Sequence, residues 1–288
     1  MSAGGDATLI GEWHGGHRAT AARGKRDGSS RLQYGTLGMI EQCEEPFNLP
    51  LLQAINDWQR GGDAKQSRKR GQSLKRVCGQ LPDEFRQCSL VCHRQIALTK
   101  SSVWELTAEE QLGEKISAWT LDIEVAKRFK GGVPPEGQGY QGIIFSRFPE
   151  QSEVIANLHR LYREVKFQLA VDTLRSRIDG FGDGIGKYGD SQCEVVVETK
   201  ELTTLDIYSF GGHSSQFDEL VLATAKLIFG PTPTIQQLNS FRLNAEQARG
   251  AAGPNWLSPE ATNRVLNRMT PHVELLKMVK KIQETIKG

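Results

Sequence analysis

The chain has 288 residues, of which 38% are hydrophobic and 24% are charged, and its formal net charge is +2 at pH 7. This composition is typical of a globular protein, and the length suits one large domain with extensions. No apolar run approaches the roughly 18 residues of a membrane-spanning helix, and the first residues lack the pattern of a signal peptide. We therefore expect a cytoplasmic protein without a membrane partner.

The five cysteines are odd in number and lack the spacing of a disulfide framework, which favours reduced thiols. Cys88, Cys92 and His93 lie close together, so one interpretation of them is a metal site. Their Cys-x-x-x-Cys spacing differs from the usual zinc motifs, and no second pair of ligands follows. We expect buried thiols on a strand here, and no metal in the protein.

Two stretches of the chain are strongly basic. Residues 18–31 hold five Lys and Arg residues against one acidic residue, and residues 60–76 hold seven against Asp63 alone. Such a stretch either forms a solvated face or contacts phosphate groups, and both alternatives stay open at this point.

The predicted secondary structure mixes helices and strands. Residues 1–48 predict a flexible basic arm, because Gly, Ala, Ser and Arg dominate much of the segment. Short strands interleaved with short helices after it indicate an α+β fold. In chain order, hydrophobic periodicity predicts helix 49–58, helix 65–80, strand 89–98, strand 115–119, helix 122–129, strand 142–148, strand 152–156, helix 158–178, strand 194–199 and strand 204–209.

We expect residues 49–212 to form one domain and residues 213–288 to form a helical C-terminal extension. The last predicted helix, over residues 258–287, places apolar residues at helical spacing with lysines between them. This helix either packs on its own domain or docks a partner protein.

A glycine-rich segment over residues 179–191 contains Gly184, Gly186 and Gly189, which fit the dinucleotide fingerprint Gly-x-Gly-x-x-Gly. That fingerprint needs a strand before it and a helix after it, because the helix N-terminus holds the pyrophosphate. Here a predicted helix precedes and a predicted strand follows, so a Rossmann site is rejected. We expect the glycines to give a loop its conformational freedom.

Two segments in the first half of the predicted domain carry side chains suited to chemistry. The predicted strand over residues 89–98 contains Arg94, whose planar guanidinium suits bidentate bonds to phosphate. The run from Ser117 through Thr120 leads into a short helix, which Asp122 is expected to cap.

A third segment is Gln192-Cys193-Glu194, at the start of a predicted apolar strand and four residues after Tyr188. On a strand, alternate residues point to the same side, so Gln192 and Glu194 are expected to reach one cleft while Cys193 faces the other way. A Gln-x-Glu triplet alone is common by chance, so it indicates a site only together with the two segments before it.

In this order and at this spacing, the three segments resemble the ADP-ribosyltransferase family, in the toxin-like branch whose site is built from Arg, Ser and Glu. The resemblance covers roughly residues 70–212. It implies a core of two small packed sheets with flanking helices. It also implies that the chain transfers one ADP-ribose from NAD⁺ to a macromolecule and releases nicotinamide.

By this resemblance, Glu194 is the catalytic carboxylate, which stabilises the oxocarbenium-like cation that forms as nicotinamide leaves. Gln192 orients the nucleophile of the target, and Gln rather than Glu here implies a nucleic acid or a protein side chain other than Arg. Arg94 holds a phosphate of NAD⁺. Tyr188 contacts the target, either by stacking on a base or by packing against a side chain.

The resemblance departs from the family at the serine. Aligned on Asp122, the family's first serine, which orients the catalytic carboxylate, falls on Ala118. Ser117 is one residue away, and on a strand it points to the other face. Either a bulge brings Ser117 in, or Thr120 takes over, or the role is lost. We favour Thr120, and the predicted NAD⁺ contacts on this strand are Ser117, Trp119 and Thr120.

The favoured interpretation is a mono-ADP-ribosyltransferase that acts inside cells as a toxin or effector, for example in a toxin–antitoxin or phage-defence system. Its partners would be NAD⁺, a nucleic-acid or protein target, and an antitoxin or other protein on the C-terminal helices. Two alternatives stay open. One is a non-enzymatic nucleic-acid-binding protein, and the other is a pseudoenzyme, which Ala118 suggests.

Overall fold

A computed structural model describes residues 46–108, 112–113, 115–135, 138–212, 217–252 and 255–287. The predicted arm over residues 1–48 therefore lies almost wholly outside the described residues. The chain divides into two compact units, each built from two separate stretches of sequence. The first unit takes the chain up to Gln87 together with Ile155–Ser191, and the second takes Cys88–Val154 together with the chain from Gln192 onward.

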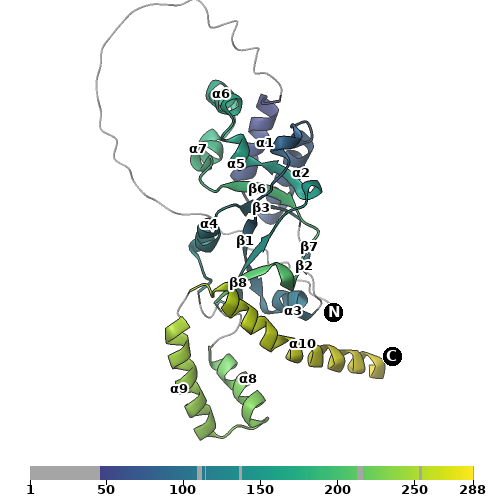
Figure 1. The fold of residues 1–288 in the computed structure, drawn as a ribbon, viewed down its shortest axis with the longest axis vertical. Coiled ribbons are helices and arrows are strands. Elements are labelled where there is room, and N and C mark those ends of the chain that lie inside the picture. The colour runs from purple at the N-terminus through teal and green to yellow at the C-terminus, as the bar shows by residue number, and fades with distance from the viewer. Residues whose placement is uncertain are drawn as a thin grey trace, which may run out of the picture. The chain divides into compact units, whose positions relative to one another are not determined.

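The described residues combine helices with antiparallel strands, which confirms the predicted α+β fold at this coarse level (Figure 1). One sheet has six strands in the order β5-β6-β3-β1-β4-β8, and a second sheet has the two strands β2 and β7. The strands are β1 (Cys92–Thr99), β2 (Leu112–Gly113), β3 (Ile116–Thr120), β4 (Tyr140–Arg147), β5 (Val154–Asn157), β6 (Glu194–Glu198), β7 (Glu201–Leu202) and β8 (Ile207–Gly212).

The first unit is mainly helical. Its helices are α1 (Leu49–Gln59), α2 (Ala64–Cys78), η1 (Asp83–Phe85), α5 (Leu158–Leu161), α6 (Val165–Leu174), η4 (Arg175–Arg177), η5 (Phe181–Asp183) and α7 (Ile185–Tyr188). Side chains fix where the first two begin, because Asn48 accepts a hydrogen bond from Leu51 N and Asp63 forms a capping box with Gln66. The long helix predicted over residues 158–178 is wrong, because the chain breaks after α5 and Glu164 caps a new helix.

Two glycines of the glycine-rich segment over residues 179–191 permit close packing within the first unit. A Cβ on Gly184 would clash with the backbone and side-chain oxygens of Asn56, and one on Gly186 would lie 2.8 Å from the Phe181 ring. The segment also contains η5 and α7 instead of a continuous loop. The expectation of conformational freedom is therefore wrong at these two positions, where the missing side chain makes room for a neighbour.

Asn56 joins α1 to this segment and is fully buried. Its Oδ1 accepts a hydrogen bond from Ile185 N at 2.9 Å, and its Nδ2 donates to Asp179 O at 2.9 Å. Asn56→Ala is expected to lower the free energy of unfolding by about 2–3 kcal/mol, because a buried donor left without a partner costs that much. Urea denaturation followed by circular dichroism measures the loss.

Gln53 provides the matched control for Asn56. Its side chain exchanges hydrogen bonds with Asp179 at exposed positions, 2.8 Å and 3.2 Å long. Water replaces exposed hydrogen bonds, so Gln53→Ala is expected to cost less than about 1 kcal/mol. Equal losses in the two variants would contradict the anchoring role of Asn56.

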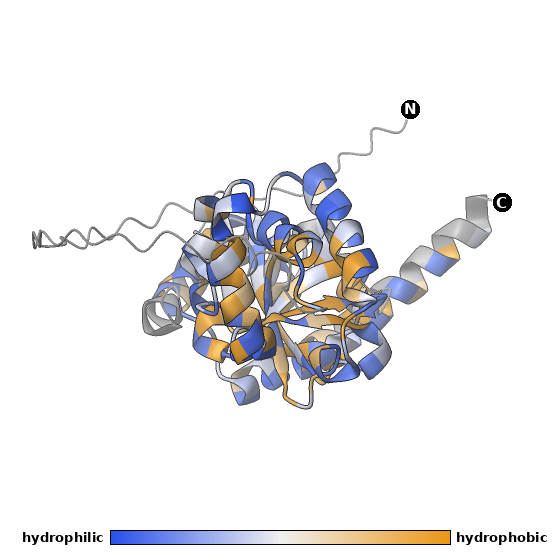
Figure 2. Ribbon diagram, turned by 90° about the horizontal axis from the view of Figure 1, so that it is seen from above, coloured by the Kyte–Doolittle hydropathy of each residue, from blue (hydrophilic) through white to orange (hydrophobic). Residues whose placement is uncertain are grey.

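The second unit packs its apolar core against one face of the larger sheet. Trp119 and the two valines Val195 and Val197 occupy alternate positions of paired strands, so their side chains share that face. α3 (Lys100–Ala108) contributes Leu106, which is fully buried in the same cluster. Figure 2 shows the hydrophobic residues concentrated on the strands and on the inner sides of helices.

Residues that follow β8 in the chain pack back against the sheet of the second unit. The C-terminal helices are α8 (Phe217–Phe229), α9 (Ile235–Ala252), which the sequence did not predict, and α10 (Pro259–Lys287). Trp256 bridges to Gly211 and its indole nitrogen donates to Lys127 O at 2.9 Å. A Cβ on Gly142 or Gly211 would collide with the Trp256 ring, so glycine is required beneath it. Of the helices in the described residues, none is long and apolar enough to cross a membrane.

Candidate functional site

A short turn fixes the end of β3 in the second unit. Asp122 caps α4 (Ile123–Arg128), as predicted, by accepting a hydrogen bond from Glu124 N at 2.8 Å. The Thr120 hydroxyl accepts a hydrogen bond from Asp122 N at 3.0 Å. The Thr120 side chain is buried and therefore has a defined position where β3 meets the helix.

A row of polar side chains crosses the sheet at this point. Thr120 is paired with Glu194 on one side and with His93 on the other, and His93 is also paired with Ser146. Residues paired directly across antiparallel strands point to the same face of a sheet. The ring of Tyr208 on β8 lies edge-on to His93, with 5.8 Å between the ring centroids. We call His93, Thr120, Ser146, Glu194 and Tyr208 the polar row.

Glu194 is the first residue of β6 and is only 4% exposed. The residue before it, Cys193, has a φ of 45°, in the left-handed region that costs a non-glycine residue roughly 1–3 kcal/mol. Even so, the Cys193 carbonyl accepts a hydrogen bond from Leu121 N at 3.0 Å, which extends the pairing of β3 with β6. A strained backbone beside a buried carboxylate is typical of functional sites.

Gln192 lies in the turn before β6 and is half-buried. The prediction that Gln192 and Glu194 face one side depended on both residues belonging to the strand. The strand begins only at Glu194, so this premise is wrong. The left-handed conformation of Cys193 also breaks the alternation on which that prediction depended.

Ser117 and Trp119 point away from Glu194. They are paired with Val197 and Val195, and their exposed fractions are 4% and 2%. The Trp119 indole nitrogen donates to Ser117 Oγ at 3.0 Å, so both polar groups have a hydrogen-bond partner on the core side of the sheet. Of the three predicted NAD⁺ contacts on β3, only Thr120 therefore shares a face with Glu194.

Arg94 lies on β1 and makes a hydrogen bond to β3, the strand of the second predicted segment. Its Nη1 donates to Ala118 O at 3.0 Å. Strand alternation puts the Arg94 Cβ on the side of Cys92, opposite to His93. The Arg94 Cβ is therefore on the face opposite to Glu194, so the predicted phosphate ligand and the predicted catalytic carboxylate do not share a face. The guanidinium donates to the backbone of β3 instead, while His93 occupies the polar row.

His93 is a residue of this site that the sequence interpretation missed. Its Nδ1 lies 2.6 Å from Ser146 Oγ. Burial lowers the pKa of His93, and the negative charge of Asp122 opposes that shift. A neutral imidazole has one donor and one acceptor nitrogen, so His93 can both donate and accept a hydrogen bond in the polar row. The strand pairing, and not the sequence, places His93 beside Thr120.

Cys88 and Cys92 approach each other in the second unit, with 3.6 Å between their sulfur atoms. Contact with the other thiol lowers the pKa of Cys88 to about 6, and the same contact together with burial raises the pKa of Cys92. His93 points to the opposite face of β1 from Cys92. These three residues therefore do not converge on one point as a metal site requires.

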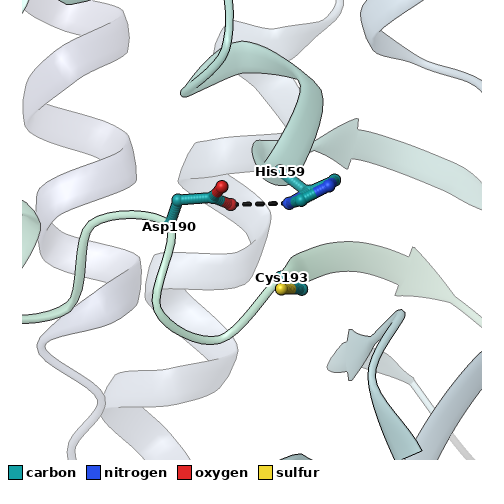
Figure 3. A group of neighbouring side chains, drawn as sticks. All are labelled: His159, Asp190 and Cys193. Carbon is teal, nitrogen blue, oxygen red and sulfur yellow. Dashed lines mark hydrogen bonds and ion pairs between the residues drawn. The ribbon is translucent and has the colours of Figure 1, made fainter.

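Tyr188 belongs to the first unit, at the end of α7, where the ammonium of Lys187 lies 5.0 Å from its ring. Close to it in sequence, Asp190 accepts a hydrogen bond from His159 Nδ1 at 2.7 Å (Figure 3). Arg163 adds an ion pair to the same carboxylate at 3.5 Å. These contacts hold the end of the segment over residues 179–191 against α5 and the turn after it.

Comparison with known proteins gives no further information on this site. No protein-family model, curated protein or solved structure gives a significant match to the chain. A function for the chain therefore has to follow from the polar row and the residues around it.

Proposed function

We propose that this chain is a mono-ADP-ribosyltransferase, which transfers ADP-ribose from NAD⁺ to a nucleic acid or to a protein side chain other than Arg. One observation supports the proposal above the others. The three segments that resemble the family are far apart in sequence, yet their strands β1, β3 and β6 are neighbours in one sheet. Chance similarity in three unrelated segments gives no reason for that adjacency.

Glu194 suits the role of the catalytic carboxylate. During transfer, the bond between the ribose C1′ and the nicotinamide nitrogen breaks, nicotinamide leaves with the bonding electron pair, and positive charge develops on the ribose. A fixed carboxylate stabilises that charge most strongly where water is excluded, and Glu194 is 4% exposed. The nucleophile of the target then bonds to C1′ and releases its proton.

Thr120 suits the role that the family assigns to its first serine. It is paired directly with Glu194, so the two side chains lie on one face with Cβ atoms about 4.5–5.5 Å apart. Asp122 N donates to the Thr120 hydroxyl at 3.0 Å, and the hydroxyl itself donates to Asp122 O at 3.5 Å, a long bond. The proposed role requires this proton to turn from Asp122 O to the Glu194 carboxylate. Thr120 is therefore a positioning residue for the carboxylate, and it takes the place left open by Ala118.

A labelling experiment tests the proposed transfer. The full chain is incubated with a cell lysate and with NAD⁺ labelled in its adenosine moiety, and samples are then treated with nuclease or with protease. We expect label in macromolecules that only one of the two treatments removes, whereas NAD⁺ labelled in nicotinamide leaves none. Absence of label from both fractions would overturn the proposal and favour a pseudoenzyme or a protein that only binds nucleic acid.

The cellular role belongs to the same proposal. An intracellular transferase of this kind would act as a toxin or a phage-defence effector, held in check by an antitoxin or another protein on the C-terminal helices. Expression in bacteria tests it, since the wild-type chain should arrest growth and Glu194→Gln should not.

A further inference from the structure

Helix α2 in the first unit presents a cationic face. In its fifteen residues, six are Lys or Arg and none is acidic. At 3.6 residues per turn, five of the six fall within an arc of about 120°. The opposite side of the helix buries Gly71, Leu74 and Cys78, so the packing of α2 turns this arc toward solvent. The five residues of the cationic face are Lys65, Arg68, Lys69, Lys75 and Arg76.

Four of these cations have no acidic partner within the part of the chain that the structure describes. Lys65, Arg68, Lys69 and Arg76 are all exposed and take part in none of the ion pairs there. Exposed cations elsewhere do have partners, as in Arg160 with Glu84 of the same unit. The charges of these four residues attract anions over a distance of about one Debye length, which is ~8 Å at physiological salt.

Positive charge is also concentrated in the unit that carries α2. Over residues 1–87 and 155–191 this unit holds nineteen Lys and Arg against fifteen Asp and Glu. The second unit holds seventeen Lys and Arg against nineteen Asp and Glu over residues 88–154 and 192–288. The formal net charge of +2 for the whole chain is therefore the sum of a positive first unit and a slightly negative second unit.

The shape of the cationic face selects among anionic partners. From Lys65 to Arg76 the helix rises by about 16 Å, a length over which one DNA strand presents about five phosphates. α2 contains no aromatic side chain, which single-strand binding sites use to stack bases. The major groove of B-form DNA admits a helix between its phosphate backbones, whereas the deep, narrow groove of A-form RNA does not.

We propose that the cationic face of α2 binds the phosphate backbone of double-stranded DNA. The contact is to phosphates, so it carries no base specificity. The proposal concerns binding alone and does not rest on transfer from NAD⁺, so either can fail while the other stands.

The test measures binding of the full chain to a labelled 20-base-pair duplex by fluorescence anisotropy, without NAD⁺, over a series of salt concentrations. The variant replaces Lys65, Arg68, Lys69 and Arg76 by glutamine, a residue with similar helix propensity. We expect its affinity at low salt to fall at least a hundredfold. The slope of log K against log salt should become shallower by about 0.9 for each phosphate that the variant no longer neutralises, or roughly 3.6 for four.

A control with the same change in net charge replaces four cations of the second unit, Arg128, Lys226, Arg242 and Lys277, by glutamine. It should bind the duplex nearly as well as the unchanged chain. Equal loss in both variants, or no loss in the α2 variant, would overturn the proposal. Equal or tighter binding of double-stranded RNA, of oligo(dT) or of anionic lipid vesicles would overturn it as well. Circular dichroism confirms that each variant keeps its helices.

Discussion

Transfer of ADP-ribose is expected to fall about 10²–10³-fold when Glu194 is replaced by glutamine, the effect of removing one preorganised group from a transition state. Glutamine keeps the shape and the hydrogen-bonding capacity of the side chain but removes its charge. The loss should appear mainly in kcat, because the positive charge on the ribose exists only while nicotinamide departs. Initial rates of nicotinamide release at saturating and limiting NAD⁺ separate kcat from KM.

Glu198 supplies a matched control on the same strand. It lies four residues further along β6, on the same face by alternation, and is paired with Ile116 outside the polar row. Glu198→Gln is expected to leave the rate unchanged. If Glu194→Gln retains the activity of the wild-type chain while its circular dichroism is normal, the assignment of the catalytic carboxylate is wrong.

The local sequence predicted secondary structure well where the hydrophobic periodicity or a capping residue gave a clear signal. The strand predicted over residues 194–199 is β6 (Glu194–Glu198), and the helix predicted over 122–129 is α4, with Asp122 as its cap. The break between α5 and α6 was missed because Glu164 caps the second helix, and glutamate is not among the residues that usually do so. Its signal is therefore weak in sequence.

The candidate site depended on information that one sequence does not carry. The pairing of His93 with Thr120, and of Thr120 with Glu194, is a choice of register between strands that are distant along the chain. Periodicity indicates that each segment is a strand but not which strand lies beside it. Arg94 was therefore identified on β1, while its neighbour His93, which the register brings beside Thr120, was considered only as a metal ligand.

Backbone conformation was a second source of error. The alternation predicted at Gln192 required an extended Cys193, and a left-handed cysteine is rare enough that no sequence pattern predicts it. The same local strain offers a reason why the strand begins so abruptly at Glu194.

The choice between the two hydroxyls of β3 leads to opposite expectations for two small substitutions. Thr120→Val keeps the volume of the side chain and removes the hydroxyl that lies on the face of Glu194. It is expected to lower kcat about tenfold or more, since a positioned hydrogen-bond donor contributes about 1.5 kcal/mol or more to a charged acceptor. Thr120→Ser retains the hydroxyl and should restore most of the rate, a rescue that a purely steric role would not give.

Ser117→Ala should act on stability instead. Ser117 Oγ is the hydrogen-bond partner of the Trp119 indole nitrogen in the apolar core, so its removal leaves a buried donor unsatisfied. The expected cost is about 1–3 kcal/mol in the free energy of unfolding, with kcat close to that of the wild-type chain. If Ser117→Ala lowers kcat and Thr120→Val does not, a rearrangement of β3 must turn Ser117 toward Glu194, and the active state has a different register between β3 and β6. If neither changes kcat, the carboxylate needs no hydroxyl on β3, and the loss of the family serine at Ala118 has no catalytic consequence.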